Sequence, residues 1–186
     1  MVARDDLPDG GASQIAEIIR TLKKECPGVA IEVLTSDFSG NPASLDTVLQ
    51  ERPDVFNHNI ETVRDLSPRV RHRATYDRTL FVLDYVKKSG LSGHVKSGMM
   101  VGLGETPSQV EETITDLHRA GCDIITMGQY LQPDQRKLLV KEFVTPEQFK
   151  RYEEFGYSIG VTKMYCGPFV RSSYHAHEVI LSSIMS

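Results

Sequence analysis

The chain has 186 residues, of which 40% are hydrophobic and 25% charged, and its formal net charge is −4. This length suffices for one sizeable core and predicts one globular domain, while the negative charge gives no electrostatic footprint for nucleic acid. No stretch is apolar for the roughly 20 residues that a membrane span requires, and the acidic, glycine-rich start has neither signal-peptide nor transit-peptide character. We therefore expect a cytosolic protein without nucleic-acid or membrane partners.

The chain begins with a helix that no strand precedes. Ile15, Ile18, Ile19 and Leu22 fall on one helical face behind Ser13, and "VAIEVLT" from Val29 reads as the following strand. Asn41 and Pro42 then open a second helix through Leu45, Val48 and Leu49, and "VFNHNIE" from Val55 supplies the next strand. The order of elements is thus helix, strand, helix, strand.

The same alternation continues through the second half. A third helix is predicted over 77–88 with a stop near Gly90, followed by a strand over 95–101. A fourth helix over 107–120 precedes the strand "DIITMGQ" from Asp123, and Thr145, Pro146 and Gln148 start a fifth helix. This rhythm predicts an α/β protein whose parallel sheet is covered by helices, as in barrels and doubly wound folds.

Four strands are fewer than a closed barrel needs. Because a parallel sheet with a long uncovered edge exposes unpaired backbone groups, we expect either a partner for that edge or a truncated sequence. Three cysteines at separate places form no metal-binding spacing and are interpreted as structural or incidental thiols in a reducing compartment: Cys26, Cys122 and Cys166. A basic run is interpreted as a solvated loop in preference to an anion-binding patch: Arg64, Arg69, Arg71, His72 and Arg73.

The stretch "GMMVGLGETPSQ" combines a buried strand, a glycine turn and a helix start. Thr106 is placed as an N-cap, Pro107 as the first helical residue and Gln109 as the partner in a capping box. Since ligands bind at the carboxyl ends of parallel strands, Glu105 stands on the expected rim. Taken alone, this pattern leaves two readings open: a ligand site, or a tight turn with a solvated glutamate.

Five motifs in order resemble those of lipoyl synthases: "RDDLPDGGA", "VFNHNIETV", "KSGMMVGLGET", "GQYLQP" and "GPFVRSSYHA". The resemblance covers residues 2–178 and implies a member of the radical S-adenosylmethionine (SAM) superfamily. Its implied fold is an incomplete (β/α) partial barrel over residues 1–145, with residues 146–186 forming a C-terminal helix and an "RSSY" tail. The implied cofactors are SAM and, in the intact family enzyme, two 4Fe–4S clusters.

The resemblance also implies which residues meet SAM. The superfamily pattern Gly-x-Ile-x-Gly-x-x-Glu is matched by Gly98, Met100, Gly102 and Glu105, with methionine in place of isoleucine; the glycines would let adenine approach the backbone, and Glu105 would hold the turn. The acidic loop near the start would meet the methionine moiety through Asp5, Asp6, Gly10 and Gly11; taken alone, it reads as an acidic turn.

The strand "NHNIET" places alternate residues on alternate faces. By resemblance Asn57, Asn59 and Glu61 point into the barrel, within reach of the ribose or carboxylate of SAM. His58 faces the other way, and a lone histidine in a strand is more often a hydrogen-bonded packing residue than a metal ligand.

In the tail, the resemblance makes Ser172 the oxygen ligand of the auxiliary cluster, with Ser173 as the reserve, and lets Arg171 offset charge there. Without the family, "RSSY" would be an ordinary polar turn. The family's two cysteine motifs, Cys-x4-Cys-x5-Cys and Cys-x3-Cys-x2-Cys, are absent, as are its first barrel strand and the body of its second. We therefore expect a fragment of a lipoyl synthase that is inactive by itself, and an organellar location if a missing N-terminus carries a transit peptide.

The implied reaction is the insertion of two sulfur atoms at C6 and C8 of an octanoyl group on a lipoyl carrier domain, either the E2 subunit of a 2-oxoacid dehydrogenase or the glycine cleavage H protein. A flavodoxin or ferredoxin would supply electrons. Two other readings remain: a truncated binding module for SAM or a carrier domain, and a cluster-free barrel aldolase. The aldolase requires a Schiff-base lysine, and Lys96 would lie at the wrong end of its strand.

Overall fold

The computed structural model describes residues 4, 6–71 and 73–172. One parallel sheet has the strand order β1-β2-β3-β4-β5, formed by Glu32–Leu34, Val55–Asn57, His94–Val101, Ile124–Gln129 and Lys163–Gly167. The helices are α1 (Ala12–Glu25), α2 (Pro42–Leu49), α3 (Ser67–Val70), α4 (Tyr76–Ser89), α5 (Pro107–Arg119) and α6 (Pro146–Ser158), with a 3₁₀ turn, η1, at Phe38–Gly40. This confirms the α/β class and the parallel sheet.

The helix starts follow from local side-chain chemistry. Asn41, Thr75, Thr106 and Thr145 each accept a hydrogen bond from a backbone N–H in the first turn of the next helix. At α5 the predicted capping box is complete, because the Gln109 side chain also accepts from the Thr106 backbone N–H at 2.8 Å. Helix α4 ends at Gly90, whose left-handed φ of 64° is typical of a residue that terminates a helix.

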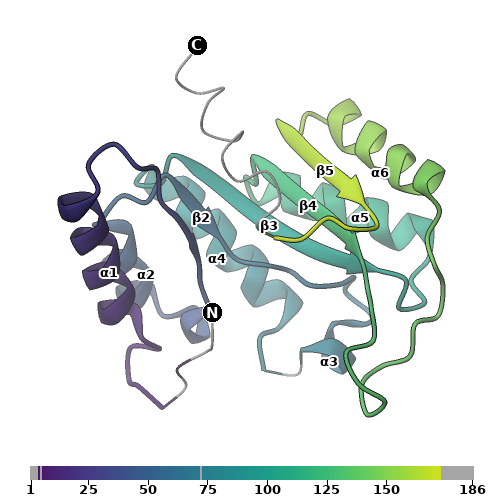
Figure 1. Ribbon diagram of the computed structural model, residues 1–186, viewed down its shortest axis with the longest axis horizontal. Helices are drawn as coiled ribbons and strands as arrows, with labels where there is room; N and C mark the ends of the chain where they lie inside the picture. The colour runs from purple at the N-terminus through teal and green to yellow at the C-terminus, as the bar shows by residue number, and fades with distance from the viewer. Residues whose placement is uncertain (1–3, 5, 72, 173–186) are drawn as a thin grey trace.

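The two faces of the sheet differ in chemistry. One face packs against the helices through a continuous apolar core that includes Val33, Phe56, Met99, Ile125 and Met164. Figure 1 shows α4 and α5 behind the strands, with α1 and α2 at one end of the sheet and α6 at the other. The opposite face carries the alternate residues of the same strands, and the site described below lies on that second face at the carboxyl ends of the strands.

Three sequence-based expectations need correction. A fifth strand, Lys163–Gly167, extends the sheet beyond the four expected, so α6 and β5 form one more helix–strand unit of the same sheet. Helix α1 begins one residue before Ser13, and its predicted apolar face is only half covered, since Ile18 and Leu22 are exposed while Ile15 and Ile19 are buried. The short helix α3 was not predicted, because its four residues are too few to show periodicity.

Candidate functional site

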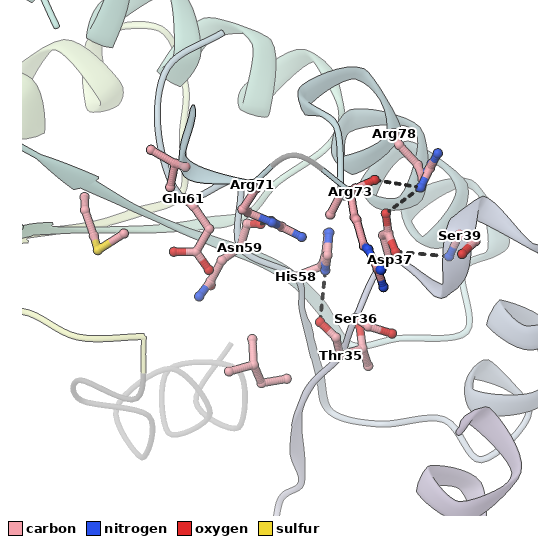
Figure 2. A pocket seen from close by; sticks show the side chains of 14 residues that line it. Thr35, Ser36, Asp37, Ser39, His58, Asn59, Glu61, Arg71, Arg73 and Arg78 are labelled. Carbon is pink, nitrogen blue, oxygen red and sulfur yellow. Dashed lines mark hydrogen bonds and ion pairs between the residues drawn. The ribbon is translucent and has the colours of Figure 1, made fainter. Parts of the chain in front are cut away.

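A cavity of about 870 Å³ opens at the carboxyl ends of β1 and β2 (Figure 2). The lining residues that were not singled out from the sequence include Ser36, Asp37 and Ser39 in the loop after β1, and Arg78 in the first turn of α4. Arg73, from the basic run, also lines the cavity. Leu34, Val70, Ala74 and Met100 give it an apolar part. Mixed charge and apolar surface in one concave site are typical of a pocket for a small charged ligand.

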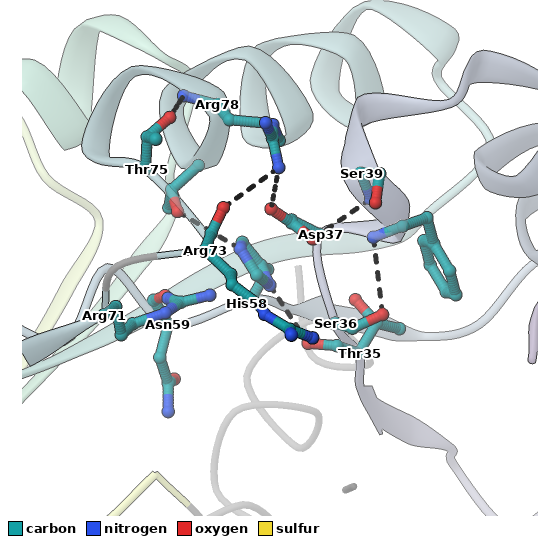
Figure 3. A network of polar contacts seen from close by, with 12 residues as sticks. Thr35, Ser36, Asp37, Ser39, His58, Asn59, Arg71, Arg73, Thr75 and Arg78 are labelled. Atoms are coloured by element: carbon teal, nitrogen blue, oxygen red, sulfur yellow. Dashed lines mark hydrogen bonds and ion pairs between the residues drawn. The ribbon is translucent and has the colours of Figure 1, made fainter. Parts of the chain in front are cut away.

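A network centred on Asp37 fixes one wall of this cavity (Figure 3). One carboxylate oxygen accepts from the Ser39 backbone N–H at 3.0 Å, and the other accepts from the Arg78 guanidinium at 3.2 Å. The same guanidinium nitrogen donates to the Arg73 carbonyl at 3.1 Å. The loop after β1 is thereby tied to the start of α4, so the wall is formed before any ligand arrives.

His58 directly follows β2 and lines the larger cavity together with Asn59 and Glu61 (Figure 2), so the expectation that it faces away from them is wrong. Its ring nitrogens lie 3.0 Å from the Thr35 carbonyl oxygen and 3.2 Å from the Thr79 hydroxyl, and only 1% of the residue is exposed. Burial lowers the pKa of His58 to about 4, and the nearby Arg71 charge acts in the same direction. A neutral, fully hydrogen-bonded histidine joins β2, the β1 loop and α4, which confirms the interpretation of His58 as a packing residue.

Arg71 and Glu61 set the charge of the opposite wall. The Arg71 guanidinium donates to the Asn59 carbonyl oxygen, and burial lowers its pKa although the nearby carboxylates oppose that change. Burial raises the pKa of Glu61, against the attraction of Arg71. Glu61 also has a left-handed φ of 70°, a conformation that is uncommon outside glycine and concentrates at functional sites. The expectation of a solvated basic run is therefore wrong for Arg71, although Arg64 and Arg69 are exposed.

A second cavity of about 230 Å³ adjoins the first along β3 and shares Asn59, Glu61 and Met100 with it. A Cβ atom on Gly98 would lie 2.8 Å from both the Asn59 side-chain oxygen and the Thr126 hydroxyl, so the packing of these two cavity-lining side chains requires glycine here. Within the described residues, the buried side-chain oxygen of Asn59 has no hydrogen-bond partner. An unpaired buried oxygen beside an open cavity is positioned to accept a hydrogen bond from a ligand.

Asn57 lies deeper than the pockets, although it shares a face with Asn59 and Glu61 as predicted. Its side-chain amide donates to Glu32 at 2.8 Å, and the Lys96 ammonium lies 2.9 and 3.0 Å from the two Glu32 carboxylate oxygens. Lys96 is completely buried and belongs to the amino-terminal half of β3. The structure therefore separates Asn57 from the pocket lining, and it places Lys96 in an ion pair below the pockets.

The turn after β3 is held by Glu105, as predicted. Its two carboxylate oxygens accept from the backbone N–H groups of Gly102 and, at 3.0 Å, Leu103. Gly102 has a φ of 101°, and a Cβ atom there would collide with the Gln129 side chain and the Glu142 carbonyl. Packing within the protein thus already requires glycine at 102, whereas the expected contact between Gly102 and adenine stays a prediction.

The acidic loop near the start of the chain forms the N-terminus of α1. Asp6 pairs with Arg4 at 2.8 Å, and Gly10 and Gly11 adopt left-handed conformations with φ of 64° and 87°. Asp9 accepts from the backbone N–H groups of Gly11 and Ser13, both at 2.9 Å, and these bonds lower its pKa to about 2. None of these residues lines either cavity, and Asp5 lies outside the described residues.

The tail reaches the second cavity. Arg171 and Ser172 line it together with Val170, and the Arg171 guanidinium donates to the Val170 carbonyl at 2.7 Å. Ser173, the alternative ligand, lies outside the described residues. The structure therefore brings Ser172 to the same cavity as Gly98 and Asn59, while its role as a cluster ligand stays a prediction.

No iron–sulfur site is formed by the described residues. In residues 4, 6–71 and 73–172, no group of three or more His, Cys, Asp or Glu side chains could hold a metal ion. Cys26 is exposed at the end of α1, whereas burial raises the pKa values of the Cys122 and Cys166 thiols. Across the described part of the chain, no helix has the length and apolar character needed to cross a membrane.

Comparison with known proteins identifies the superfamily of the chain. The model of the radical SAM superfamily matches residues 8–117, which include β1, β2, β3 and both walls of the larger cavity. The chain belongs to the radical SAM superfamily. Its similarity to a solved radical SAM methyltransferase from Kitasatospora setae is weak, with a TM-score of 0.47 and 14% identity over 63% of this chain and 24% of that one, and adds nothing to the assignment.

Within the superfamily, the similar curated proteins are lipoyl synthases. The chain is 59% identical to the lipoyl synthase of Protochlamydia amoebophila, 54% identical to that of Caldanaerobacter subterraneus, and 50% identical to that of Thermus thermophilus. These matches cover 97%, 94% and 98% of this chain but 57%, 61% and 57% of the relatives. The resemblance drawn from the five motifs is confirmed, and the chain spans about three fifths of the length of these relatives.

Proposed function

We propose that this chain acts in lipoyl synthesis, the radical SAM-dependent insertion of two sulfur atoms at C6 and C8 of an octanoyl group carried by a protein. The observation that carries the proposal is the pair of joined cavities at the carboxyl edge of the sheet, in a chain that is 50 to 59% identical to lipoyl synthases over nearly its whole length. The substrate would be a lipoyl carrier protein, and the finer partners would be an E2 domain or H protein and a flavodoxin or ferredoxin.

The described residues fit SAM. Its α-carboxylate suits the Arg71 guanidinium, and its α-ammonium suits the carboxylates of Asp37 and Glu61, all of which line the larger cavity. The unpartnered oxygen of Asn59 would accept from a ribose hydroxyl, and the purine would lie in the second cavity, which Gly98 lines. When bound and reduced by one electron, which the described residues do not themselves supply, SAM would provide the carbon radical that removes a hydrogen atom from an unactivated chain. These residues would orient SAM and the octanoyl group and exclude water.

The same residues do not fit the family's iron–sulfur clusters. The sequence contains three cysteines in all, and the described residues show no convergent set of ligands. After anaerobic treatment of the purified chain with iron and sulfide, we expect iron well below one cluster per chain and no 5′-deoxyadenosine. Stoichiometric 4Fe–4S content with reductive cleavage of SAM would contradict this expectation.

Calorimetric titration of the purified chain with SAM tests the proposed site directly. Binding should weaken by about tenfold or more in Gly98→Ala, because the added methyl group would push the Asn59 and Thr126 side chains from their places in the cavity lining. Gly167→Ala is the matched control, since a Cβ atom there makes only an ordinary contact with Val170 at 3.5 Å. Equal SAM affinity in wild type and Gly98→Ala would remove this cavity from the SAM site.

A further inference from the structure

A third cavity of about 250 Å³ lies on the same edge of the molecule as the proposed SAM site. We call it the rim groove, and its lining residues are Leu66, Arg69, Val70, Leu103, Lys137, Leu138, Leu139 and Lys141. Val70 lines both the rim groove and the large cavity, so the two are neighbours. Figure 1 shows α3 beside the long segment that connects β4 to α6, and these two elements form the groove.

The segment 130–145 has no regular secondary structure, yet side chains and backbone hold it firmly. The Gln129 amide accepts from the Val144 N–H at 2.9 Å and donates to the Glu142 carbonyl at 3.0 Å. Tyr130 donates its hydroxyl proton to the Leu138 carbonyl at 2.9 Å, and Lys141 N–H donates to the Gly102 carbonyl at 2.8 Å. Long connections of this kind are uncommon in compact domains and are usually functional.

Large apolar side chains on this segment face solvent. Leu131 is 50% exposed, Leu139 61% and Phe143 72%. The apolar wall of the rim groove, formed by Leu66, Leu103 and Leu138 among others, adjoins Leu139. Of the three, Leu139 lines the rim groove and Leu131 lines the second cavity. An exposed leucine that continues the apolar wall of a groove indicates a contact site for another molecule.

Positive charge surrounds the apolar wall. Arg69, Lys137 and Lys141 are exposed, and within the described residues none of them makes an ion pair. Of the two acids on the segment, Asp134 is paired with Arg136 at 3.3 Å, and Glu142 does not line the groove. The chain as a whole carries a net charge of −4, so this cationic groove departs from the charge of the rest of the molecule.

We propose that the rim groove is the docking surface for the carrier protein, and that this partner presents acidic residues around an apolar side chain next to its acylated lysine. This proposal rests on the proposed function. A protein fits better than a nucleic acid because the groove lining contains no aromatic residue for base stacking and is apolar at its centre. Docking here would bring the acylated lysine to the neighbouring large cavity across Val70.

The test measures binding of the purified chain to the octanoylated lipoyl domain of a bacterial 2-oxoacid dehydrogenase, at low and at physiological ionic strength. The variant Lys137→Glu/Lys141→Glu should bind at least about tenfold more weakly and lose most of the salt dependence. Leu139→Ser should also weaken binding, without changing the salt dependence. The matched control is Lys24→Glu/Lys88→Glu, which changes net charge equally at the helix ends on the opposite edge of the sheet.

Several outcomes would overturn the docking proposal. Equal weakening in the control variant would mean that total charge, and not the groove, attracts the carrier. Unchanged carrier affinity in both groove variants would also contradict the docking proposal. It would be contradicted as well if an acidic protein without an acylated lysine, or single-stranded RNA, bound as tightly as the carrier. SAM titration of each protein separates the two proposals: retained SAM binding without carrier binding contradicts only the docking surface, whereas absent SAM binding contradicts the proposed function.

Discussion

The ammonium of Lys96 lies 2.9 and 3.0 Å from the two carboxylate oxygens of Glu32, so a completely buried cation in β3 is joined to β1 across the intervening strand. Asn57 of that intervening strand donates to the same carboxylate. Three neighbouring strands are thus cross-linked by buried polar groups on the face of the sheet opposite the main apolar core.

Lys96→Met should destabilise the protein by about 3 to 5 kcal/mol, because it leaves the Glu32 carboxylate without its cation in a largely buried position. The double variant Glu32→Gln/Lys96→Met should recover part of that loss, since it removes the uncompensated charge. Urea unfolding of the wild type and both variants measures the difference. If the single and double variants are equally unstable, the ion pair is not the source of the effect.

The buried His58 predicts a loss of stability in mild acid. Its pKa is about 4 in the folded protein and about 6.5 when unfolded, so the unfolded chain binds the proton first as the pH falls. The free energy of unfolding should therefore decrease between pH 6.5 and 4, by up to about 3 kcal/mol from this residue. The raised pKa of Glu61 acts in the opposite direction and reduces the total.

Urea unfolding over this pH range checks the prediction against His58→Asn, which removes the titrating group while keeping hydrogen-bonding capacity. The slope of stability against pH should be flatter in the variant. An unchanged slope would show that other groups cause the acid sensitivity.

Gly102→Ala should destabilise the protein by about 3 kcal/mol or more, because it adds both a strained left-handed conformation and a collision with Gln129 and Glu142. Gly90→Ala is the control: its φ is 64°, but its Cβ would meet nothing within 4 Å, so only the conformational cost of about 1 kcal/mol remains. Thermal unfolding compares the two. A weakened SAM affinity in Gly102→Ala at unchanged stability would instead support a direct adenine contact.

Ser172 lines the second cavity, where the family resemblance makes it a cluster ligand. In a lipoyl synthase that holds both clusters, Ser172→Ala should still form 5′-deoxyadenosine from SAM but yield little lipoyl product. Mass spectrometry of the carrier and chromatography of the nucleoside measure the two separately. Full lipoyl product from this variant would move the assignment to Ser173.

The sequence was sufficient for those parts of the fold in which one strong local signal decides the structure. Capping residues such as Thr106 and Asn41 marked helix starts correctly, and continuous apolar runs marked strands in which nearly every residue is buried. Strand β5 was not predicted because its "KMYCG" run is short and mostly half-buried. It lacks the alternation or the apolar continuity of the other strands. Ile18 and Leu22 were misjudged because helical periodicity shows an apolar face without showing how much of it a neighbour covers.

The site was predictable only where chemistry lies within one motif. Glu105 and the glycine turn belong to one short stretch, and so its hydrogen bonds could be foreseen. The Asp37–Arg78 contact joins residues 41 positions apart, and Arg71 reaches the cavity because of how its loop folds back over β2. The sequence also could not show how deeply each side chain lies. Asn57 and Asn59 have the same place in the alternating pattern, yet only Asn59 lines a pocket.

Gln129 is a buried residue whose amide holds Val144, Glu142 and Tyr130 in place. Because these hydrogen bonds come from a buried side chain, exposed positions such as Leu139 and Phe143 contribute little to the backbone conformation of the segment 130–145. Such positions are free to diverge among descendants of one gene while the backbone course remains the same. Substitutions on the surface alone can therefore change the charge and apolar character of this edge while the buried hydrogen bonds of Gln129 keep the backbone in place.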